Sequence, residues 1–492
     1  MPVRVRYAPS PTGSPHVGNL RTAIYDWLLA RKEGGEYIAR LEDTDRDPTR
    51  YKPEYIQDIE RSLRFLGIEP DEWWVSGGPR APYVQSERLD RYREVANQLI
   101  EKGHAYRCFC TEERLKQMRE QLQAQGHSTG YDRLCRHASD DDKKRNLEGG
   151  TPFVIRLAIP LEGVANLEDA VYGHVEFDYR GQDDPVLLKS NGWPTYHLAA
   201  MVDDHDTGIT HVIRGEDWLS SAPKHVFLFE AMGWQPPVFA HVPLIVGTDK
   251  KKLSKRHGST TFTEFIEQGY LPEALFNFLV LLGWSPGEAD RELFSREEIV
   301  ERFSLSGIST HPAVFDYDKL KWMNGEYIRA TPIDRLVDLC LPYLVESGLV
   351  ANPPSEEERI FVTKVIPLIT ERIKLLSEVG PSTEFLFREP SEPEEKGRRK
   401  WLTGDRATDI LTQAVRWFGM TRDDFSEEGA ELATDNIATT LGIERGPVIH
   451  TLRIAVTGRT VGPGLFETLA VLGKQRILAR LERAKSWVIS EE

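Results

Sequence analysis

Residues 3–19 read VRVRYAPSPTGSPHVGN, and this stretch decides the fold. Val3, Val5 and Tyr7 alternate with arginines, which is the period-two pattern of a short strand. Residues 8–15 hold three prolines, a glycine and two serines, so we expect the chain to turn there. The next segment is predicted to be a helix packed on a sheet, because it carries the apolar stripe Leu20, Ala23, Ile24, Trp27 and Leu28.

A second strand is expected over residues 37–41, directly before the acidic run EDTD. Strand, helix and strand in this order predict a parallel α/β sheet. Residues 108–189 bring cysteines, a polar helix and short β-like runs, which we interpret as an α+β insertion. The sheet pattern resumes over residues 190–257, and helical spacing dominates from there on, with a hydrophilic stretch at residues 389–400 interpreted as a linker.

The composition is that of a globular chain with several cores. Of its 492 residues 28% are charged and 10% are aromatic, and this aromatic content excludes disorder as the main feature. The densest apolar run, residues 276–284, is about half of the roughly 20 residues that cross a bilayer, so we expect a core helix and no membrane partner. Four cysteines do not indicate a disulfide scaffold, and no apolar leader precedes the first strand. These features predict a cytoplasmic protein.

Two loops hold candidate functional residues. The first, residues 9–19, lies after a strand and before a helix. The free N–H groups at the start of that helix, near Gly18, are suited to a phosphate, and we expect His16 to donate a hydrogen bond to a phosphate oxygen. The second, residues 250–258, reads KKKLSKRHG and carries five cations within seven residues. Each loop alone is weak evidence, because a proline-rich loop is commonly only a turn and a lysine run is commonly a solvated surface.

Together the two loops resemble the signature motifs of class I aminoacyl-tRNA synthetases. The HIGH motif of that class matches residues 16–19, and its KMSKS motif matches residues 252–256. Other stretches narrow the resemblance to the bacterial glutamyl-tRNA synthetase family over nearly the whole chain: RYAPSPTG at 6–13, RLEDTD at 40–45, PTYHLA at 194–199, VDDH at 202–205, RGED at 214–217, DKLKWMN at 318–324 and LFE at 465–467.

The resemblance implies ATP-dependent ligation of L-glutamate to tRNA(Glu) through glutamyl-adenylate, with Mg²⁺ on the ATP phosphates. Both attacking groups belong to substrates, so the protein needs to supply alignment and positive charge rather than a nucleophile. The implied catalytic residues are His16, Gly18, Lys252 and Lys255. The implied ATP-binding residues are Pro9, Ser10, Thr12, Gly13, His16, Gly18, Asn19 and Lys255. The implied glutamate-binding residues are Arg6, Ala8, Ser10, Glu42, Tyr196 and Arg214.

Two of these residues, and Ala200 beside them, carry an alternative or a departure. Arg214 either pairs with a substrate carboxylate, which suits a guanidinium fork, or forms an internal salt bridge to Glu216 or Asp217. Asn19 replaces the last histidine of the HIGH motif, which the family tolerates. Ala200 stands where relatives carry an amide that helps to hold the amino acid, so that contact is open here.

The cysteines of the insertion suggest a metal site. Cys108, Cys110, Cys135 and His137 could close a tetrahedral site for a structural Zn²⁺, one per chain, although the Cys-x-Cys spacing is unlike the usual knuckle and buried free thiols are the alternative. The family includes zinc-bearing members with this arrangement. The fourth cysteine, Cys340, is predicted to pack in a core.

The resemblance also predicts the domain order. We expect a Rossmann-type catalytic domain over residues 1–107 and 190–257, interrupted by the connective domain at 108–189. A helical stem-contact domain is expected at 258–325, and two anticodon-binding helical subdomains at 326–388 and 389–492. With a net charge of −15, tRNA contact has to rely on local basic clusters such as residues 398–400 and 474–483, which are equally well explained as solvated helix faces.

Several functional alternatives stay open at this stage. The enzyme could also charge tRNA(Gln), and a paralogue of another class would bind tRNA without catalysis. The helical C-terminal half argues against a short paralogue that modifies a tRNA base and against a glutaminyl enzyme with C-terminal β-barrels. A monomer is expected.

Overall fold

The computed structural model describes residues 2–126, 130–253, 258, 261–288, 291–421 and 425–490. It divides into two compact units. Unit 1 comprises Met1–Ile266 and Pro272–Tyr317, and unit 2 comprises Glu267–Leu271 and Asp318–Glu492. Lys255, one of the predicted catalytic residues, lies outside the described residues.

The strands in the described residues all belong to unit 1. They are β1 (Arg4–Tyr7), β2 (Glu36–Ala39), β3 (Ala105–Cys108), β4 (Val154–Leu157), β5 (Val164–Asp169), β6 (Gly173–Asp178), β7 (Val186–Leu188), β8 (His211–Gly215), β9 (Val238–Val242), β10 (Ile245–Val246) and β11 (Ala313–Val314).

The α-helices that begin in unit 1 are α1 (Val17–Lys32), α2 (Glu54–Leu66), α3 (Leu89–Glu101), α4 (Glu112–Ala124), α5 (Asp140–Glu148), α6 (Tyr196–Asp206), α7 (Ala222–Met232), α8 (Phe262–Gln268), α9 (Pro272–Leu281), α10 (Arg296–Arg302) and α11 (Tyr317–Ala330). Those that follow in unit 2 are α12 (Ile333–Glu346), α13 (Glu356–Ile369), α14 (Val379–Phe387), α15 (Glu395–Trp401), α16 (Gly404–Gly419), α17 (Glu427–Leu441), α18 (Arg445–Thr457), α19 (Leu465–Leu472) and α20 (Lys474–Ala484).

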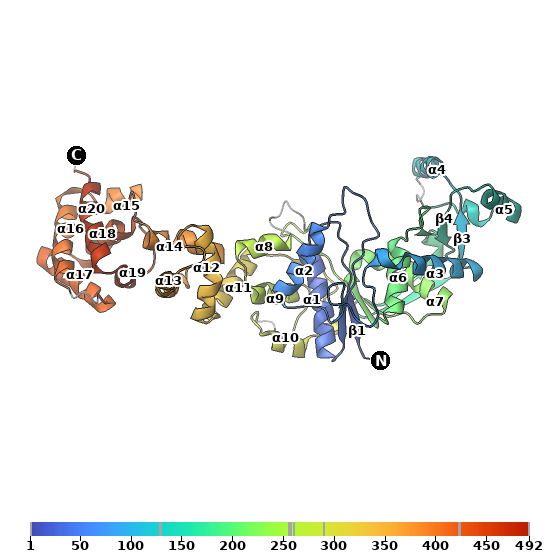
Figure 1. Ribbon diagram of the computed structural model, residues 1–492, viewed down its shortest axis with the longest axis horizontal. Coiled ribbons are helices and arrows are strands. Elements are labelled where there is room, and N and C mark those ends of the chain that lie inside the picture. Colours follow the sequence, from blue (N-terminus) through green and yellow to red (C-terminus); the bar gives the residue numbers. More distant parts are fainter. Residues whose placement is uncertain are drawn as a thin grey trace. The chain divides into compact units, whose positions relative to one another are not determined.

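The first strand, helix and strand form the predicted parallel unit. β1 pairs in parallel with β2, with Val5 opposite Tyr37, and α1 packs against both strands (Figure 1). β1 also lies against β8, because the backbone N–H of Thr210 donates to the carbonyl of Arg4 at 2.9 Å. β8 pairs in parallel with β9, so strands from before and after the insertion stand side by side, as the sequence predicts.

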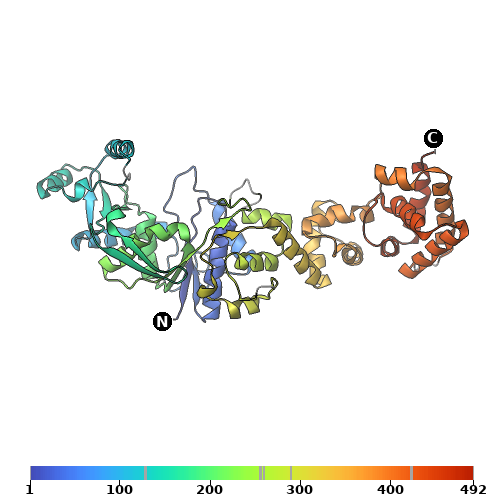
Figure 2. The same cartoon turned by 180° about the vertical axis from the view of Figure 1, so that it is seen from behind.

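The insertion contains its own antiparallel sheet, ordered β3, β4, β7. The predicted polar helix of this segment is α4, and its N-cap is Thr111, whose hydroxyl accepts from the N–H of Arg114. A helix begins there because Thr111 satisfies one of the N–H groups that the first turn leaves unpaired. In the view from behind, α4 and α5 both lie beyond the outer end of this sheet (Figure 2).

Unit 2 is helical where the structure describes it, as predicted from its hydrophobic spacing (Figure 2). The expected linker at residues 389–400 is wrong in part, because Glu395 onward forms α15. The side chain of Arg398 donates to the carbonyl of Trp487, and Arg399 pairs with Glu395 one turn away. Local ion pairing and a long-range contact therefore outweigh the polar composition that suggested a linker.

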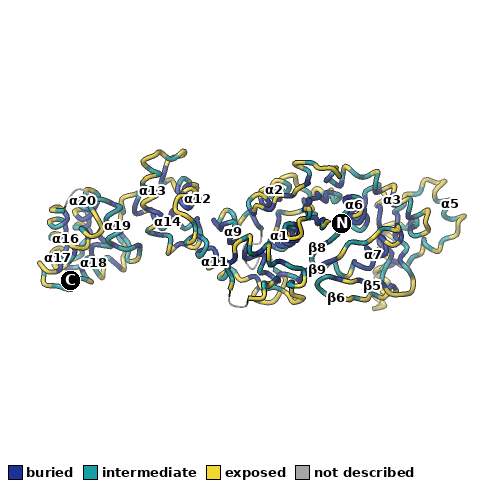
Figure 3. Tube along the Cα trace, turned by 90° about the horizontal axis from the view of Figure 1, so that it is seen from below, coloured by how far each residue is buried: buried dark blue, intermediate teal, exposed yellow. Residues whose placement is uncertain are grey.

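Buried side chains form separate cores along the chain (Figure 3). One core in unit 1 joins α3, α6 and α7 to the strands of the insertion. The core of unit 2 runs from Val365 to Trp487, and Cys340 is fully buried, as expected. Of the helices in the described ranges, none combines the length and the apolar character needed to cross a bilayer.

Candidate functional site

A cleft of about 1000 Å³ opens in unit 1 beside β1, β8 and the start of α1. Its lining includes His16 from the first predicted loop and Lys252 from the second. The two loops therefore face a shared space, which is the relationship that the sequence predicts for a common ligand. The side chain of Lys252 is 71% exposed and lies 4.0 Å from Asp217.

His16 has a second task that the sequence does not indicate. It is the N-cap of α1, and its Nδ1 accepts from the N–H groups of Gly18 at 3.1 Å and Asn19 at 3.4 Å. Because Nδ1 accepts, Nε2 carries the proton of the neutral ring and is the atom that can donate to a ligand. Burial, and then the nearby charge of Lys252, lower the pKa of His16, which favours this neutral form.

The predicted ATP-binding residues divide into two groups. Pro9, Ser10, His16, Gly18 and Asn19 line the cleft. Thr12 and Gly13 belong to the same loop but are not part of its lining, and the hydroxyl of Thr12 is 3.4 Å from that of Ser10.

All six predicted glutamate-binding residues line the cleft: Arg6, Ala8, Ser10, Glu42, Tyr196 and Arg214. Arg6 is already paired, since its Nε lies 3.1 Å from Asp204 and its Nη1 donates to the carbonyl of Ile213 at 3.3 Å. Burial alone would lower the pKa of Arg6, but the charge of Asp204 raises it above its ordinary value. Arg6 therefore stays charged at the wall of the cleft.

Glu42 is the buried acid of this site. It is 8% exposed and accepts from Arg40 at 3.0 Å. Burial raises the pKa of Glu42, and Arg40 opposes that shift only in part. An ammonium group brought beside Glu42 would favour its ionised form, because opposite charges at close range stabilise each other when water is excluded. Ala200 is fully buried in α6 and does not line the cleft.

Arg214 does not form the internal salt bridge that was the alternative. Glu216 instead accepts from the hydroxyl of Tyr172 and from the backbone N–H of Leu244. In the described part of the chain, no carboxylate forms an ion pair with Arg214. The partners of Arg214 are two histidines: Nε donates to His241 at 3.0 Å, and Nη1 to His225 at 3.0 Å. Sequence reasoning missed both histidines, because only strand pairing and helix packing bring them to Arg214.

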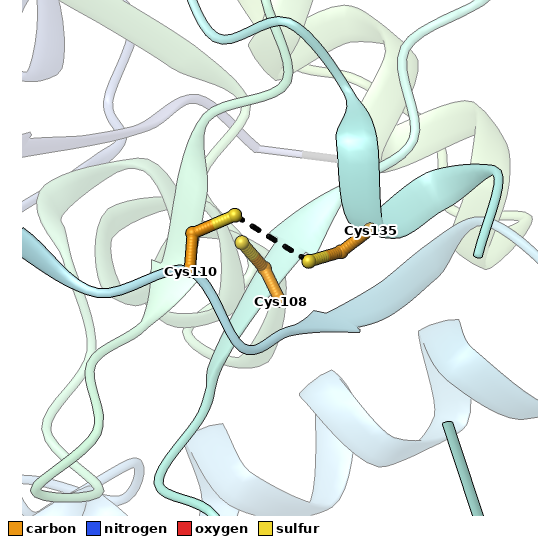
Figure 4. A group of neighbouring side chains, drawn as sticks. All are labelled: Cys108, Cys110 and Cys135. Atoms are coloured by element: carbon orange, nitrogen blue, oxygen red, sulfur yellow. Dashed lines mark hydrogen bonds between the residues drawn. The ribbon is translucent and has the colours of Figure 1, made fainter. Parts of the chain in front are cut away.

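The three cysteines of the insertion converge as predicted (Figure 4). The Sγ atoms of Cys108, Cys110 and Cys135 all lie within 4.8 Å of one another, and those of Cys110 and Cys135 are 3.5 Å apart. Sulfur ligands of a tetrahedral zinc, each about 2.3 Å from the metal, stand about 3.8 Å from one another. The three thiols therefore fit a zinc ion.

The predicted fourth ligand is not in this group. His137 is exposed, and its ring is not among the ligand atoms that meet at the three thiols. The buried hydroxyl of Tyr131 lies there instead, 3.2 Å from the Sγ of Cys108 and 3.4 Å from that of Cys110. Sequence reasoning missed Tyr131, since a tyrosine is an uncommon metal ligand and gives no spacing signal.

The basic residues of unit 2 are mostly engaged within the protein. Glu389 accepts from Arg476, Arg480 and Arg483, all on one face of α20. Arg480 is fully buried and also donates to the carbonyl of Val456 at 2.7 Å. These arginines bind the start of the segment expected to be a linker through internal ion pairs, and the buried Arg480 is not part of a solvated helix face.

Comparison with known proteins places this cleft in a family. Residues 2–322 match the family of class I tRNA synthetases (E and Q), catalytic domain, and residues 335–485 match the anticodon binding domain. A glutamate–tRNA ligase from Moorella thermoacetica is 42% identical over 486 residues, which cover 99% of this chain and 98% of that protein. The chain belongs to the glutamate–tRNA ligase family.

Other glutamate–tRNA ligases agree along the full length. The one from Dehalococcoides mccartyi is 44% identical over 98% of this chain and 97% of its own. A crystal structure of a glutamate tRNA ligase from Elizabethkingia meningosepticum, in complex with its amino acid, superposes with a TM-score of 0.90 at 35% identity and covers 99% of both chains. The Rossmann-type catalytic domain and the helical anticodon-binding region expected from the sequence are therefore those of a class I synthetase.

Proposed function

We propose that this chain ligates L-glutamate to tRNA(Glu) at the expense of ATP. The observation that carries the proposal is the shared cleft, in which His16 and Lys252 lie with the charged residues Glu42 and Arg214. One side of the cleft thus suits a nucleotide and another suits a small zwitterion with an extra carboxylate.

The reaction has two steps. In the first, the α-carboxylate of glutamate attacks the α-phosphate of ATP, and pyrophosphate leaves. In the second, a ribose hydroxyl of the terminal tRNA adenosine attacks the acyl carbon, and AMP leaves with the electrons of the broken bond. The protein accelerates both by alignment and by placing positive groups where phosphate charge develops.

We assign the nucleotide to the loop before α1. The Nε2–H of His16 donates to a phosphate oxygen, and Lys252 and Lys255 supply cationic charge. Pro9, Ser10, Thr12, Gly13, Gly18 and Asn19 shape the surface on which ATP lies. Mg²⁺ would arrive with the phosphates and neutralise part of their charge, and Asp217, which lines the cleft, offers the oxygen ligands that this ion prefers.

We assign the amino acid to the part of the same cleft that Arg6, Glu42, Tyr196 and Arg214 line. Arg6 and Arg214 receive the carboxylates, Glu42 receives the ammonium group, and Ala8, Ser10 and Tyr196 complete the pocket. The buried position of Arg214 supports this assignment, because a guanidinium held away from water interacts strongly with an anion that displaces the remaining solvent.

We also propose that Cys108, Cys110 and Cys135 hold one structural zinc ion, with the fourth position taken by Tyr131 or, after a loop adjustment, by His137. The zinc would cross-link two segments of an insertion with only a small core around the thiols.

The remaining assignments follow from family membership. The domain boundaries given above, a monomeric state and a cytoplasmic location are proposed on that basis. Charging of tRNA(Gln) is a separate activity that the same experiment decides.

The test is direct. Purified protein is incubated with labelled glutamate, ATP and Mg²⁺, together with purified tRNA(Glu) or tRNA(Gln), and acid-precipitable label is counted. We expect esterification of tRNA(Glu), and none when ATP is omitted. Tight binding of tRNA(Glu) without esterification would overturn the proposal in favour of an inactive tRNA-binding paralogue, and equal charging of tRNA(Gln) would identify a non-discriminating enzyme.

A further inference from the structure

Arg214 lies in the middle of a buried chain of hydrogen bonds. Asp169 at the end of β5 is 2.6 Å from Nδ1 of His241 on β9, and Nε2 of His241 is 3.0 Å from Nε of Arg214 on β8. On the other side, Nη1 of Arg214 is 3.0 Å from Nδ1 of His225 on α7, whose Nε2 is 3.0 Å from Nδ1 of His197 on α6. Five side chains from five elements are thus connected in sequence.

The N–H donors of Arg214 determine which ring nitrogen of His241 and of His225 carries the proton. A guanidinium can only donate, so Nε2 of His241 and Nδ1 of His225 must accept. The remaining ring nitrogens then carry the protons, which point to Asp169 and to His197. Both rings are therefore neutral. Burial, followed by the charge of Arg214, lowers the pKa of His225 well below its ordinary value, and burial also lowers that of His241.

Asp169 keeps His241 in this tautomer. Besides the ring of His241, it accepts from the backbone N–H groups of Val171 and Tyr172 at 2.9 and 3.0 Å. Burial acts to raise the pKa of Asp169, but these bonds outweigh it and lower the pKa below its ordinary value. A fixed carboxylate thus holds the proton of His241 on Nδ1 and leaves Nε2 free to accept.

Neutral partners leave the charge of Arg214 uncompensated. The contrast is Arg40, which is buried beside Asp203, Asp204 and Glu42 and forms ion pairs with all three. Arg214 is 5% exposed, and its Nη2 is buried with no hydrogen-bond partner among the residues described. An unpaired charge and an unused donor inside a protein are costly, so this arrangement is suited to an anion that enters the cleft.

We propose that His241 and His225 are positioning residues that orient Arg214 for the substrate carboxylate. By accepting from Nε and Nη1 they fix the plane of the guanidinium, and by being neutral they leave its charge, and its Nη2, for glutamate. A carboxylate in either place would orient the guanidinium equally well but would neutralise it and repel the substrate. This inference rests on the proposed role of Arg214 in glutamate binding.

The test compares acceptor-deleting with acceptor-retaining variants in the full enzyme. His241→Leu removes the acceptor, whereas His241→Gln keeps an oxygen that can accept from Nε; His225→Leu and His225→Gln form the second pair. His174→Gln is the control, because His174 is exposed on β6 and, in the part of the chain that the structure describes, its ring hydrogen-bonds to Glu168 and Glu176, neither of which belongs to the chain of hydrogen bonds through Arg214. KM for glutamate and KM for ATP are measured in the aminoacylation assay, with the melting temperature of each variant.

We expect His241→Leu and His225→Leu to raise KM for glutamate by about 10- to 100-fold, the cost of leaving one buried donor unsatisfied, with KM for ATP within about twofold. The glutamine variants should recover most of this loss. The proposal is overturned if the two KM values change equally or if the glutamine variants do not restore KM for glutamate. It is also overturned if both leucine variants fail to fold. If Arg214→Ala itself leaves KM for glutamate unchanged, the proposed glutamate site fails; if it raises that KM while the histidine variants do not, only the positioning role fails.

Discussion

Nδ1 of His16 accepts from the backbone N–H of Gly18 at 3.1 Å, so the imidazole caps the helix on which it stands. The cap turns the ring so that Nε2–H is the free donor. His16 thus caps the start of α1 and presents a hydrogen-bond donor to the cleft. The two roles can be separated by substitution.

Replacing His16 should affect stability and catalysis differently. His16→Asn keeps a side-chain acceptor of the kind preferred at N-caps and should leave the free energy of unfolding nearly unchanged, whereas His16→Ala should lower it by about 1 kcal/mol. Both variants lose the Nε2 donor, and kcat should fall by about 100-fold or more in each. Chemical denaturation and aminoacylation kinetics check this, and an asparagine variant with full activity would contradict the assigned donor role.

Gly18→Ala should reduce activity without reducing stability. The added Cβ would lie 3.1 Å from both Cε1 and Nδ1 of His16, so the ring has to move. Alanine is the better helix former by up to about 1 kcal/mol, which offsets the crowding in the folded state. The matched control is Gly446→Ala, at the second position of α18, where nothing lies within 4 Å of the added atom. A Gly18 variant as active as the Gly446 variant would contradict the prediction.

Arg214→Ala should raise KM for glutamate by about 100-fold, since a charge-assisted hydrogen bond to a substrate carboxylate is lost. KM for ATP should change little, because the nucleotide is assigned to the loop before α1 and not to Arg214. Steady-state kinetics with each substrate varied in turn provide the measurement. Similar increases in both constants would instead mean that Arg214 only supports the fold.

The thiol cluster predicts about one equivalent of zinc per chain in protein never exposed to chelator. Cys135→Ser should lose the metal and lower the melting temperature, because a cross-link between two segments of the insertion is removed. Tyr131→Phe and His137→Ala then identify the fourth ligand by which of them weakens zinc retention during dialysis against a chelator. If protein never exposed to chelator contains no metal, and Cys135→Ser has the melting temperature of the unaltered protein, the three thiols only pack as a core.

Glu389→Gln should destabilise the protein by about 1–3 kcal/mol at neutral pH, because Arg480 is left buried without its counter-charge. The cost stays below that of a fully buried pair, since the side chain of Glu389 is 46% exposed. Burial acts to raise the pKa of Glu389, but Arg480 and Arg476 outweigh it and lower the pKa from 4.5 to about 2. A lowered carboxyl pKa contributes stability that is present above pH 4.5 and is lost as the pH falls toward 2.

The difference in melting temperature between Glu389→Gln and the unaltered protein should therefore stay the same from neutral pH down to about pH 4.5 and shrink as the pH falls further toward 2. Glu384→Gln is the control, because among the described residues Glu384 on α14 forms a single ion pair, an exposed one with Arg388 just after the helix. A difference independent of pH would contradict the assigned pairing.

The sequence was sufficient to predict the first strands and helix, and the residues that its linear motifs mark. The period of the apolar residues predicted β1 and α1, and the linear motifs predicted that His16, Lys252, Glu42 and Arg214 line one cleft. It could not predict contacts between segments that only the fold brings together. His241 lies opposite Arg214 in the β8–β9 register, and a loop brings Tyr131 to the three cysteines. Spacing along the chain shows neither contact. The expected linker failed because polar composition cannot reveal that Glu389 is held by three arginines of a distant helix.

The structure of the enzyme with a non-hydrolysable ATP analogue tests the central claim most directly, because it shows whether both loops contact one nucleotide. We expect Nε2 of His16 and Nζ of Lys252 both to lie within hydrogen-bond distance of phosphate oxygens of the same molecule, in the cleft that Arg214 also lines. A nucleotide bound outside this cleft, or one that touches only one of the two loops, would contradict it.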